Sequence, residues 1–136
     1  MVKPIYLLDT NTWIYALKGQ PAALLSRMGA VDPDEIALCS VVKAELLYGA
    51  YRSGNQAKQL ELLHSLFSRH RSFGFDDSAA EIYARIRRGL ERDGKIIGPM
   101  DLLIAAIALA NDLVLVTHNT AEFRRIADLQ LADWAI

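Results

Sequence analysis

The sequence IYLLDTNTWI, at residues 5–14, places a carboxylate at the end of a short run of apolar side chains. Residues 5–8 are uniformly apolar, which is typical of a strand that is buried on both faces of a parallel sheet. Asp9 follows this strand directly. Because a buried charge costs free energy unless it is paired, hydrogen-bonded or bound to a metal ion, we expect Asp9 to have such a partner.

Strand and helix patterns alternate through the rest of the chain. The hydrophobic periodicity, the capping residues and the turn residues predict strands over residues 5–8, 36–39, 72–75 and 113–117, and helices over residues 12–18, 22–28, 41–51, 56–69, 77–94 and 99–110. The stretch after the last strand is expected to be short and irregular. Strands that alternate with helices indicate an α/β protein, in which helices cover both faces of a central parallel sheet in a three-layer α/β/α sandwich.

The length and composition predict one folded domain over residues 1–136. Of the 136 residues, 52% are hydrophobic and 23% are charged, which excludes a disordered chain. No apolar run reaches the ~18 residues of a membrane-spanning helix, so no membrane partner is expected. The net charge of −1 means that any basic surface for a nucleic acid must be local. A single cysteine, Cys39, fits a reducing, cytoplasmic location.

A second carboxylate, Glu45, interrupts the apolar pattern of the helix predicted over residues 41–51. At 100° per residue it falls within an arc that contains Val41, Val42, Leu46, Tyr48 and Gly49. An acid in that position requires a partner. The alternative is a partly exposed glutamate at the rim of the apolar face.

A third carboxylate, Asp101, lies in the first turn of the helix over residues 99–110. Residues 102–110 are all apolar, which predicts a central, buried helix. An acid at a helix N-terminus is also stabilised by the helix dipole, by ~0.3–1 kcal/mol, so Asp101 taken alone is better explained as a helix-start residue.

The three acids are expected to meet at one edge of the sheet. Ligands of such sheets bind beyond the carboxyl ends of the strands, where Asp9 lies. Closely packed carboxylates repel one another unless a cation intervenes. Their hard oxygen ligands suit Mg²⁺ or Mn²⁺, and the sequence has no Cys/His spacing for zinc. A metal held in this way suits phosphate-ester hydrolysis.

Four motifs, in order along the chain, carry a resemblance to a known family. They are LLDTNTWIYALKG at 7–19, VVKAELLYGA at 41–50, GPMDLLIAAIALANDLVLVTHNTAEFRRI at 98–126 and ADW at 132–134. Together they resemble the PIN-domain ribonuclease toxins of type II toxin–antitoxin systems, the VapC-like family. The resemblance implies a Mg²⁺- or Mn²⁺-dependent endoribonuclease that forms a homodimer and is inhibited by a small antitoxin. Hydrolysis by water would leave 5′-phosphate and 3′-hydroxyl ends on the RNA.

The resemblance also implies roles for individual residues. Asp9, Glu45 and Asp101 match the three acids of the family, and all three are expected to be catalytic and to bind the metal. Thr117 and Asn119 match the motif after the fourth strand, where many PIN domains carry a fourth acid. The neutral Asn119 puts a tight second metal site in doubt.

Other residues are assigned supporting roles. Asn119 and Asn11 are expected to orient a water or a ligand carboxylate by hydrogen bonds, and Thr10 is expected to cap the helix that follows it. Arg92 and Lys95 are candidates for contacts with RNA phosphates, with a solvated helix face as the alternative.

Two competing functions remain. A degenerate PIN domain would only bind a partner. A haloacid-dehalogenase-like phosphatase also begins with a strand that ends in Asp, but it requires a second Asp two residues later, where this chain has Asn11.

The helices that begin at residues 41 and 56 carry more apolar or aromatic residues than one face of a small sheet needs to cover it. These residues include Tyr48, Tyr51, Leu60 and Leu63, and their excess also predicts a homodimer.

Overall fold

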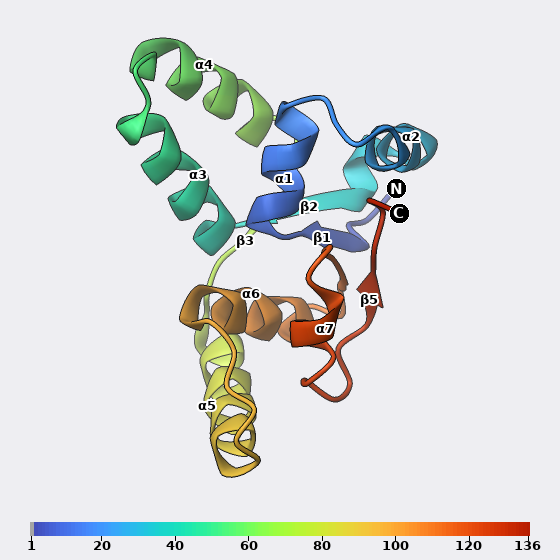
Figure 1. Cartoon of the computed structure of the whole chain (residues 1–136), viewed down its shortest axis with the longest axis vertical. Coiled ribbons are helices and arrows are strands. Elements are labelled where there is room, and N and C mark those ends of the chain that lie inside the picture. The colour runs from blue at the N-terminus through green and yellow to red at the C-terminus, as the bar shows by residue number, and fades with distance from the viewer. Residues whose placement is uncertain (1) are drawn as a thin grey trace.

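The computed structural model describes residues 2–136, which form a five-stranded parallel sheet with the strand order β3-β2-β1-β4-β5 (Figure 1). The strands are β1 Tyr6–Leu8, β2 Ile36–Cys39, β3 Ser72–Phe73, β4 Val114–Val116 and β5 Leu131–Ala132. The chain leaves β1 toward β2 on one side, and it later returns to place β4 on the other side. The strand order therefore reverses between β1 and β4, which is where open α/β sheets bind their ligands.

Helices cover both faces of the sheet and make it the middle of three layers. They are α1 Thr10–Leu17, α2 Ala22–Ala30, α3 Ser40–Arg52, α4 Gln56–Phe67, α5 Asp77–Arg92, α6 Pro99–Ala110 and α7 Thr120–Phe123, with a 3-10 turn, η1, at Pro33–Glu35. Figure 1 shows α1 to α4 on one side of the sheet and α5 to α7 on the other. The predicted α/β/α sandwich with a parallel sheet is confirmed.

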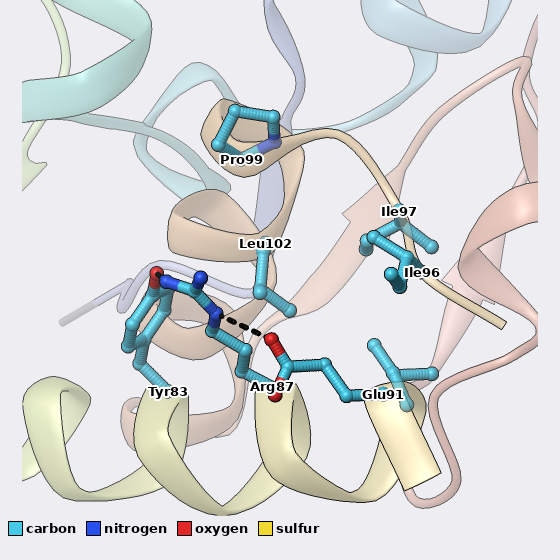
Figure 2. Close-up of a pocket in the computed structure, with 8 residues that line it drawn as sticks. Tyr83, Arg87, Glu91, Ile96, Ile97, Pro99 and Leu102 are labelled. Carbon is cyan, nitrogen blue, oxygen red and sulfur yellow. Dashed lines mark hydrogen bonds and ion pairs between the residues drawn. The ribbon is translucent and has the colours of Figure 1, made fainter. Parts of the chain in front are cut away.

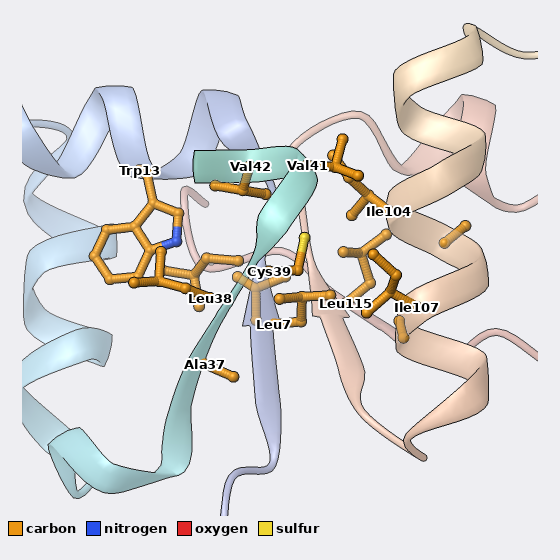
Figure 3. Packing of buried hydrophobic residues seen from close by; sticks show 14 of the residues in the cluster. Leu7, Trp13, Ala37, Leu38, Cys39, Val41, Val42, Ile104, Ile107 and Leu115 are labelled. Carbon is orange, nitrogen blue, oxygen red and sulfur yellow. The ribbon is translucent and has the colours of Figure 1, made fainter. Parts of the chain in front are cut away.

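The core lies where the three central strands meet α1 and α6 (Figure 3). Leu7, Leu38 and Leu115 each come from a different strand and are fully buried. Leu7 and Leu115 are on the face that Ile104 of α6 covers, whereas Leu38 is on the opposite face, beside Trp13 of α1. Short strands that are apolar throughout bury both of their faces. The sheet is therefore packed between α1 on one face and α6 on the other.

The chain after β4 is more regular than predicted. It contains α7 and the edge strand β5, where Leu131 pairs with Leu115 and Ala132 with Val116. Between them Asp128 adopts a left-handed backbone conformation, with φ 68°. Elements of four and two residues are too short to produce a hydrophobic period, so tertiary pairing rather than local sequence determines them.

Leu63 is not available for the predicted dimer surface. It is 4% exposed and belongs to the core of the protomer, while Leu60 is partly buried against the same core. The reason is that α4 packs back on α3. Tyr48 and Tyr51 are 64% and 60% exposed and remain the residues on which the dimer prediction rests. Within residues 2–136 no helix has both the length and the apolar character needed to cross a bilayer.

Candidate active site

Asp9 is buried between the ends of β1 and β4, and its charge is satisfied by hydrogen bonds. The Thr12 backbone N–H donates to its Oδ1 at 2.9 Å, which makes Asp9 the N-cap of α1. The Thr117 hydroxyl donates to its Oδ2 at 2.6 Å. The prediction that Thr10 caps this helix is therefore wrong, because the carboxylate one residue earlier does so.

Thr117 connects the predicted site residues that follow β4. It is 1% exposed, and its Oγ1 accepts a hydrogen bond from the Asn119 backbone N–H at 3.0 Å while it donates to Asp9. One hydroxyl thus fixes both the carboxylate after β1 and the turn after β4. Sequence position alone placed these residues at one sheet edge, and the structure shows how they are joined.

Glu45 lies on α3, next to the first turn of α1. Its Oε1 accepts a hydrogen bond from the Thr10 hydroxyl at 2.5 Å. The apolar arc predicted around it is wrong in part, because Tyr48 and Gly49 are exposed on the outer side of α3. Glu45 is half-buried at the rim of that face, the alternative that the sequence left open, but it still faces the first turn of α1.

Asp101, in the first turn of α6, is the acid with the most strongly perturbed charge. Burial is the largest cause, and Asp9, Glu122 and Glu45 add repulsion, so the pKa of Asp101 rises from 3.8 to about 6. All the charged groups that act on it are carboxylates. The structure therefore places Asp9, Glu45 and a fourth acid, Glu122, close enough to Asp101 for their charges to raise its pKa. These four residues form the acid cluster.

The fourth acid, Glu122 on α7, was missed by sequence reasoning. Its Oε1 accepts from the Gly98 backbone N–H at 2.9 Å, and its Oε2 accepts from Asn119 Nδ2 at 2.8 Å. These two hydrogen bonds, with that from Asn119 the stronger, lower the pKa of Glu122. It lies beside Asp101, because a Cβ placed on Gly98 would be 3.6 Å from Asp101 Oδ2 and 4.0 Å from Glu122 Oε1.

A sequence signal for Glu122 does exist. Asn119 precedes α7 and Glu122 is three residues later, which is the spacing of an N-terminal capping pattern. The family resemblance places the fourth acid at position 119 itself. In the structure Asn119 binds the acid instead of replacing it.

Three predicted site residues are not drawn into the acid cluster. Asn11 is exposed on α1, and no hydrogen bond joins its side chain to the acids in the described part of the chain. Arg92 and Lys95 are exposed at the end of α5 and in the segment after it, and neither is among the groups that shift the pKa of Asp101. Their proposed contacts with phosphate must therefore be made outside the cluster.

The donor chemistry of the cluster fits a hard divalent cation. Across residues 2–136, no three His, Cys, Asp or Glu side chains stand in position to ligate one metal ion. The cluster nevertheless offers carboxylate oxygens from four elements or their ends, and the repulsion on Asp101 is what a bound cation would relieve. Oxygen donors without sulfur or imidazole suit Mg²⁺ or Mn²⁺.

Known proteins are similar in sequence to this chain over nearly its whole length. The sequence profile of the PIN domain matches residues 6–129. The protein named tRNA(fMet)-specific endonuclease VapC of Shigella flexneri is 35% identical over 130 residues, which cover 96% of this chain and 98% of that protein. Ribonuclease VapC2 of Rickettsia felis is 37% identical over 131 residues, with the same two shares.

Solved structures agree with these sequence matches. The DNA-bound VapBC of Salmonella typhimurium superimposes with a TM-score of 0.90 at 34% identity, covering 96% of this chain and 98% of that chain. VapBC2 of Rickettsia felis, bound to a DNA fragment from its promoter, gives a TM-score of 0.88 at 37% identity, with the same coverage.

Replacement of Asp101 by Asn is expected to stabilise the metal-free protein above about pH 6 and to change little near pH 4. Because the pKa of Asp101 is raised to about 6, the native protein holds this proton more tightly than the unfolded chain, and stability is lost as the pH rises from about 4 through about 6. The neutral amide side chain of the D101N variant avoids that loss. Thermal melts in EDTA from pH 4 to pH 8 measure the difference.

Asp112→Asn, at the opposite end of α6, is the matched control, because Asp112 is exposed and Asn tolerates its φ of 53°. If D101N melts below the wild type above pH 6, Asp101 acts as a helix-start charge, with a loss of ~0.3–1 kcal/mol.

Proposed function

We propose that this chain, which belongs to the PIN-domain family and to its VapC branch, is a metal-dependent endoribonuclease and the toxin of a toxin–antitoxin pair. The proposal rests on the placement of four acids, Asp9, Glu45, Asp101 and Glu122, at the point where the strand order reverses, where burial and the charges of the other three raise the pKa of Asp101. Relatives that match almost end to end are named as ribonucleases.

Asp9, Asp101 and Glu122 are the residues proposed to hold Mg²⁺, with Mn²⁺ as a substitute. Glu45, which the family resemblance also places among the metal ligands, is proposed to act on the attacking water. When bound, the cation would polarise a phosphoryl oxygen and lower the pKa of a water. Asp9 is held rigidly by Thr12 and Thr117, so its position does not depend on the ligand. Glu122 is likewise fixed by Asn119 and Gly98.

Glu45 is proposed to receive the proton of the attacking water. Its Oε1 is engaged by Thr10, and within residues 2–136 its Oε2 accepts no hydrogen bond. That free oxygen belongs to an acid close enough to Asp101 to raise the pKa of the latter. A carboxylate oriented through one oxygen presents the other in a defined direction, which is what a general base requires.

The partner proposed for the toxin is a VapB-like antitoxin, and the chain itself is proposed to be a homodimer. Solved structures that are 34% to 37% identical to this chain are of VapBC proteins, and a further one, VapBC-5 of Mycobacterium tuberculosis at 27% identity, is described as a member of the VapBC family of toxin–antitoxin systems. A carboxylate cluster is inhibited when an Arg or Lys takes the place of the cation in a charge-assisted hydrogen bond. The exposed Arg92 and Lys95 of this chain are proposed to contact phosphates of the RNA.

Cleavage of single-stranded RNA by the purified protein with Mg²⁺ is expected to leave 5′-phosphate and 3′-hydroxyl ends and to stop in excess EDTA. Asp101→Asn should lower the rate by more than the ~10–100-fold that loss of an outer-shell partner of a metal site costs. Asp112→Asn should cleave like the wild type. End-labelled products resolved on a sequencing gel report all three results.

A 2′,3′-cyclic phosphate product, or full activity in EDTA, would contradict metal-assisted attack by water. Absence of cleavage under all metal conditions would favour the degenerate PIN domain that only binds a partner. The phosphatase alternative is replaced by the match to the PIN domain over residues 6–129.

Co-expression with the small open reading frame expected immediately upstream should restore growth of cells that express this chain. The physical reason is that a basic side chain of the antitoxin neutralises the acid cluster and excludes the cation. Growth is measured against cells that co-express an unrelated peptide of the same length. Equal growth in the two cultures would show that the inhibitory pairing is wrong.

A further inference from the structure

A cavity of about 280 Å³ lies between α5 and the first turn of α6 (Figure 2). Its interior is apolar, with Leu90, Ile97 and Leu102 buried in its walls. Ile96 stands at its edge with 65% of its surface exposed. The cavity is slightly smaller than the ~300 Å³ at which pockets for drug-sized ligands begin, so it suits a single ring system.

The rim of this cavity carries an oriented polar group. Arg87 Nη1 donates to the Tyr83 hydroxyl at 2.8 Å, and Arg87 Nε donates to Glu91 Oε2 at 3.2 Å. Figure 2 shows these three side chains rising from α5 toward Leu102. Within residues 2–136, Arg87 Nη2 and Glu91 Oε1 have no hydrogen-bond partner. Among the described residues, the rim of the apolar cavity thus keeps one hydrogen-bond donor and one acceptor without a partner.

The cavity adjoins the acid cluster through α6. Pro99 and Leu102 lie on one face of the first helical turn and line the cavity, and Asp101 lies in the same turn. Gly98, directly before this turn, binds Glu122 through its backbone N–H. Asp101 points to another side of this turn than Pro99 and Leu102, so the cavity and the acids are separated by about the width of one helix, ~10–12 Å.

Resting on the proposed function, we propose that this cavity is a subsite for one unstacked base of the RNA, adjacent to the scissile phosphate. RNA is read mainly through single-stranded bases that stack on aromatic or guanidinium planes and form hydrogen bonds with their edges. The Arg87 guanidinium already lies over the Tyr83 ring, with 5.9 Å from its Cζ to the ring centroid, so a base would stack on the outer face of this pair. Glu91 Oε1 and Arg87 Nη2 supply an acceptor and a donor for the base edge.

A purely apolar occupant fits less well. A Leu or Ile side chain of a protein partner, or of a second copy of this chain, would fill the floor but cover Arg87 Nη2 and Glu91 Oε1 without replacing their water. Polar groups that lose water and gain no partner cost free energy, and those that carry charge cost more. A nucleobase has both a flat apolar face and paired donors and acceptors at its edge.

The test is the cleavage kinetics, with Mg²⁺, of short single-stranded RNAs that carry an abasic nucleotide at successive positions around the cut. In the wild type, one position next to the cut should lower kcat/KM about tenfold when its base is removed, mainly through KM, since stacking of one base contributes ~1–3 kcal/mol. Arg87→Gln should cleave the intact RNA less well and lose less than about twofold on removal of that base. Arg88→Gln, the same change on the neighbouring exposed residue of α5, should keep the tenfold effect.

Each other outcome overturns the proposal in a distinguishable way. Cleavage with no position-specific effect of an abasic nucleotide, or an equal effect in Arg87→Gln and the wild type, would refute the subsite and leave the nuclease intact. A change of oligomeric state in Arg87→Gln during sedimentation, with base dependence retained, would assign the cavity to a second copy. Absence of any RNA cleavage would refute the proposed function and the subsite together.

Discussion

The hydrogen bond from the Thr117 hydroxyl to the buried carboxylate of Asp9 is the interaction on which the site depends. It joins the ends of β1 and β4, which pair in register through Leu8 and Val116 just before it. The same carboxylate caps α1 through Thr12, so one side chain fixes two strands and a helix. A charge buried in this way is tolerated because it is fully hydrogen-bonded, and it gives the sheet edge a carboxylate whose position is set by the core.

The other acids are held around this point by contacts between elements: Thr10 binds Glu45, and the Gly98 N–H binds Glu122. Asp101 begins a helix that is buried along most of its length, and Glu122 is tied to the residue before that helix by the Gly98 N–H. The consequence is that burial, together with the repulsion of the neighbouring acids, raises the pKa of Asp101. Such stored repulsion lowers the stability of the metal-free fold and favours the binding of a cation at the same place.

Sequence reasoning found the features that break a strong pattern. Asp9, Glu45 and Asp101 stand out because apolar residues surround them, and the central strands and α6 stand out because they are apolar throughout. Elements that are very short, or that depend on tertiary contacts, were not predicted. α7 has four residues and β5 has two, and Glu122 was missed because it lies on α7. The burial of Leu63 depends on how α4 packs on α3, and the cavity beside α6 depends on the distance between α5 and α6. The hydrophobic periodicity of a single helix predicts neither of them.

The acids of this sheet edge are proposed to form one binding site for a divalent cation. The most direct measurement is Mn²⁺ binding by the purified, RNA-free protein, followed by the electron paramagnetic resonance signal of the free ion. The wild type and Asp112→Asn should remove Mn²⁺ from solution with equal affinity, and Asp101→Asn should bind at least about tenfold more weakly. Equal affinity in Asp101→Asn and the wild type, or no binding by the wild type, would contradict the account.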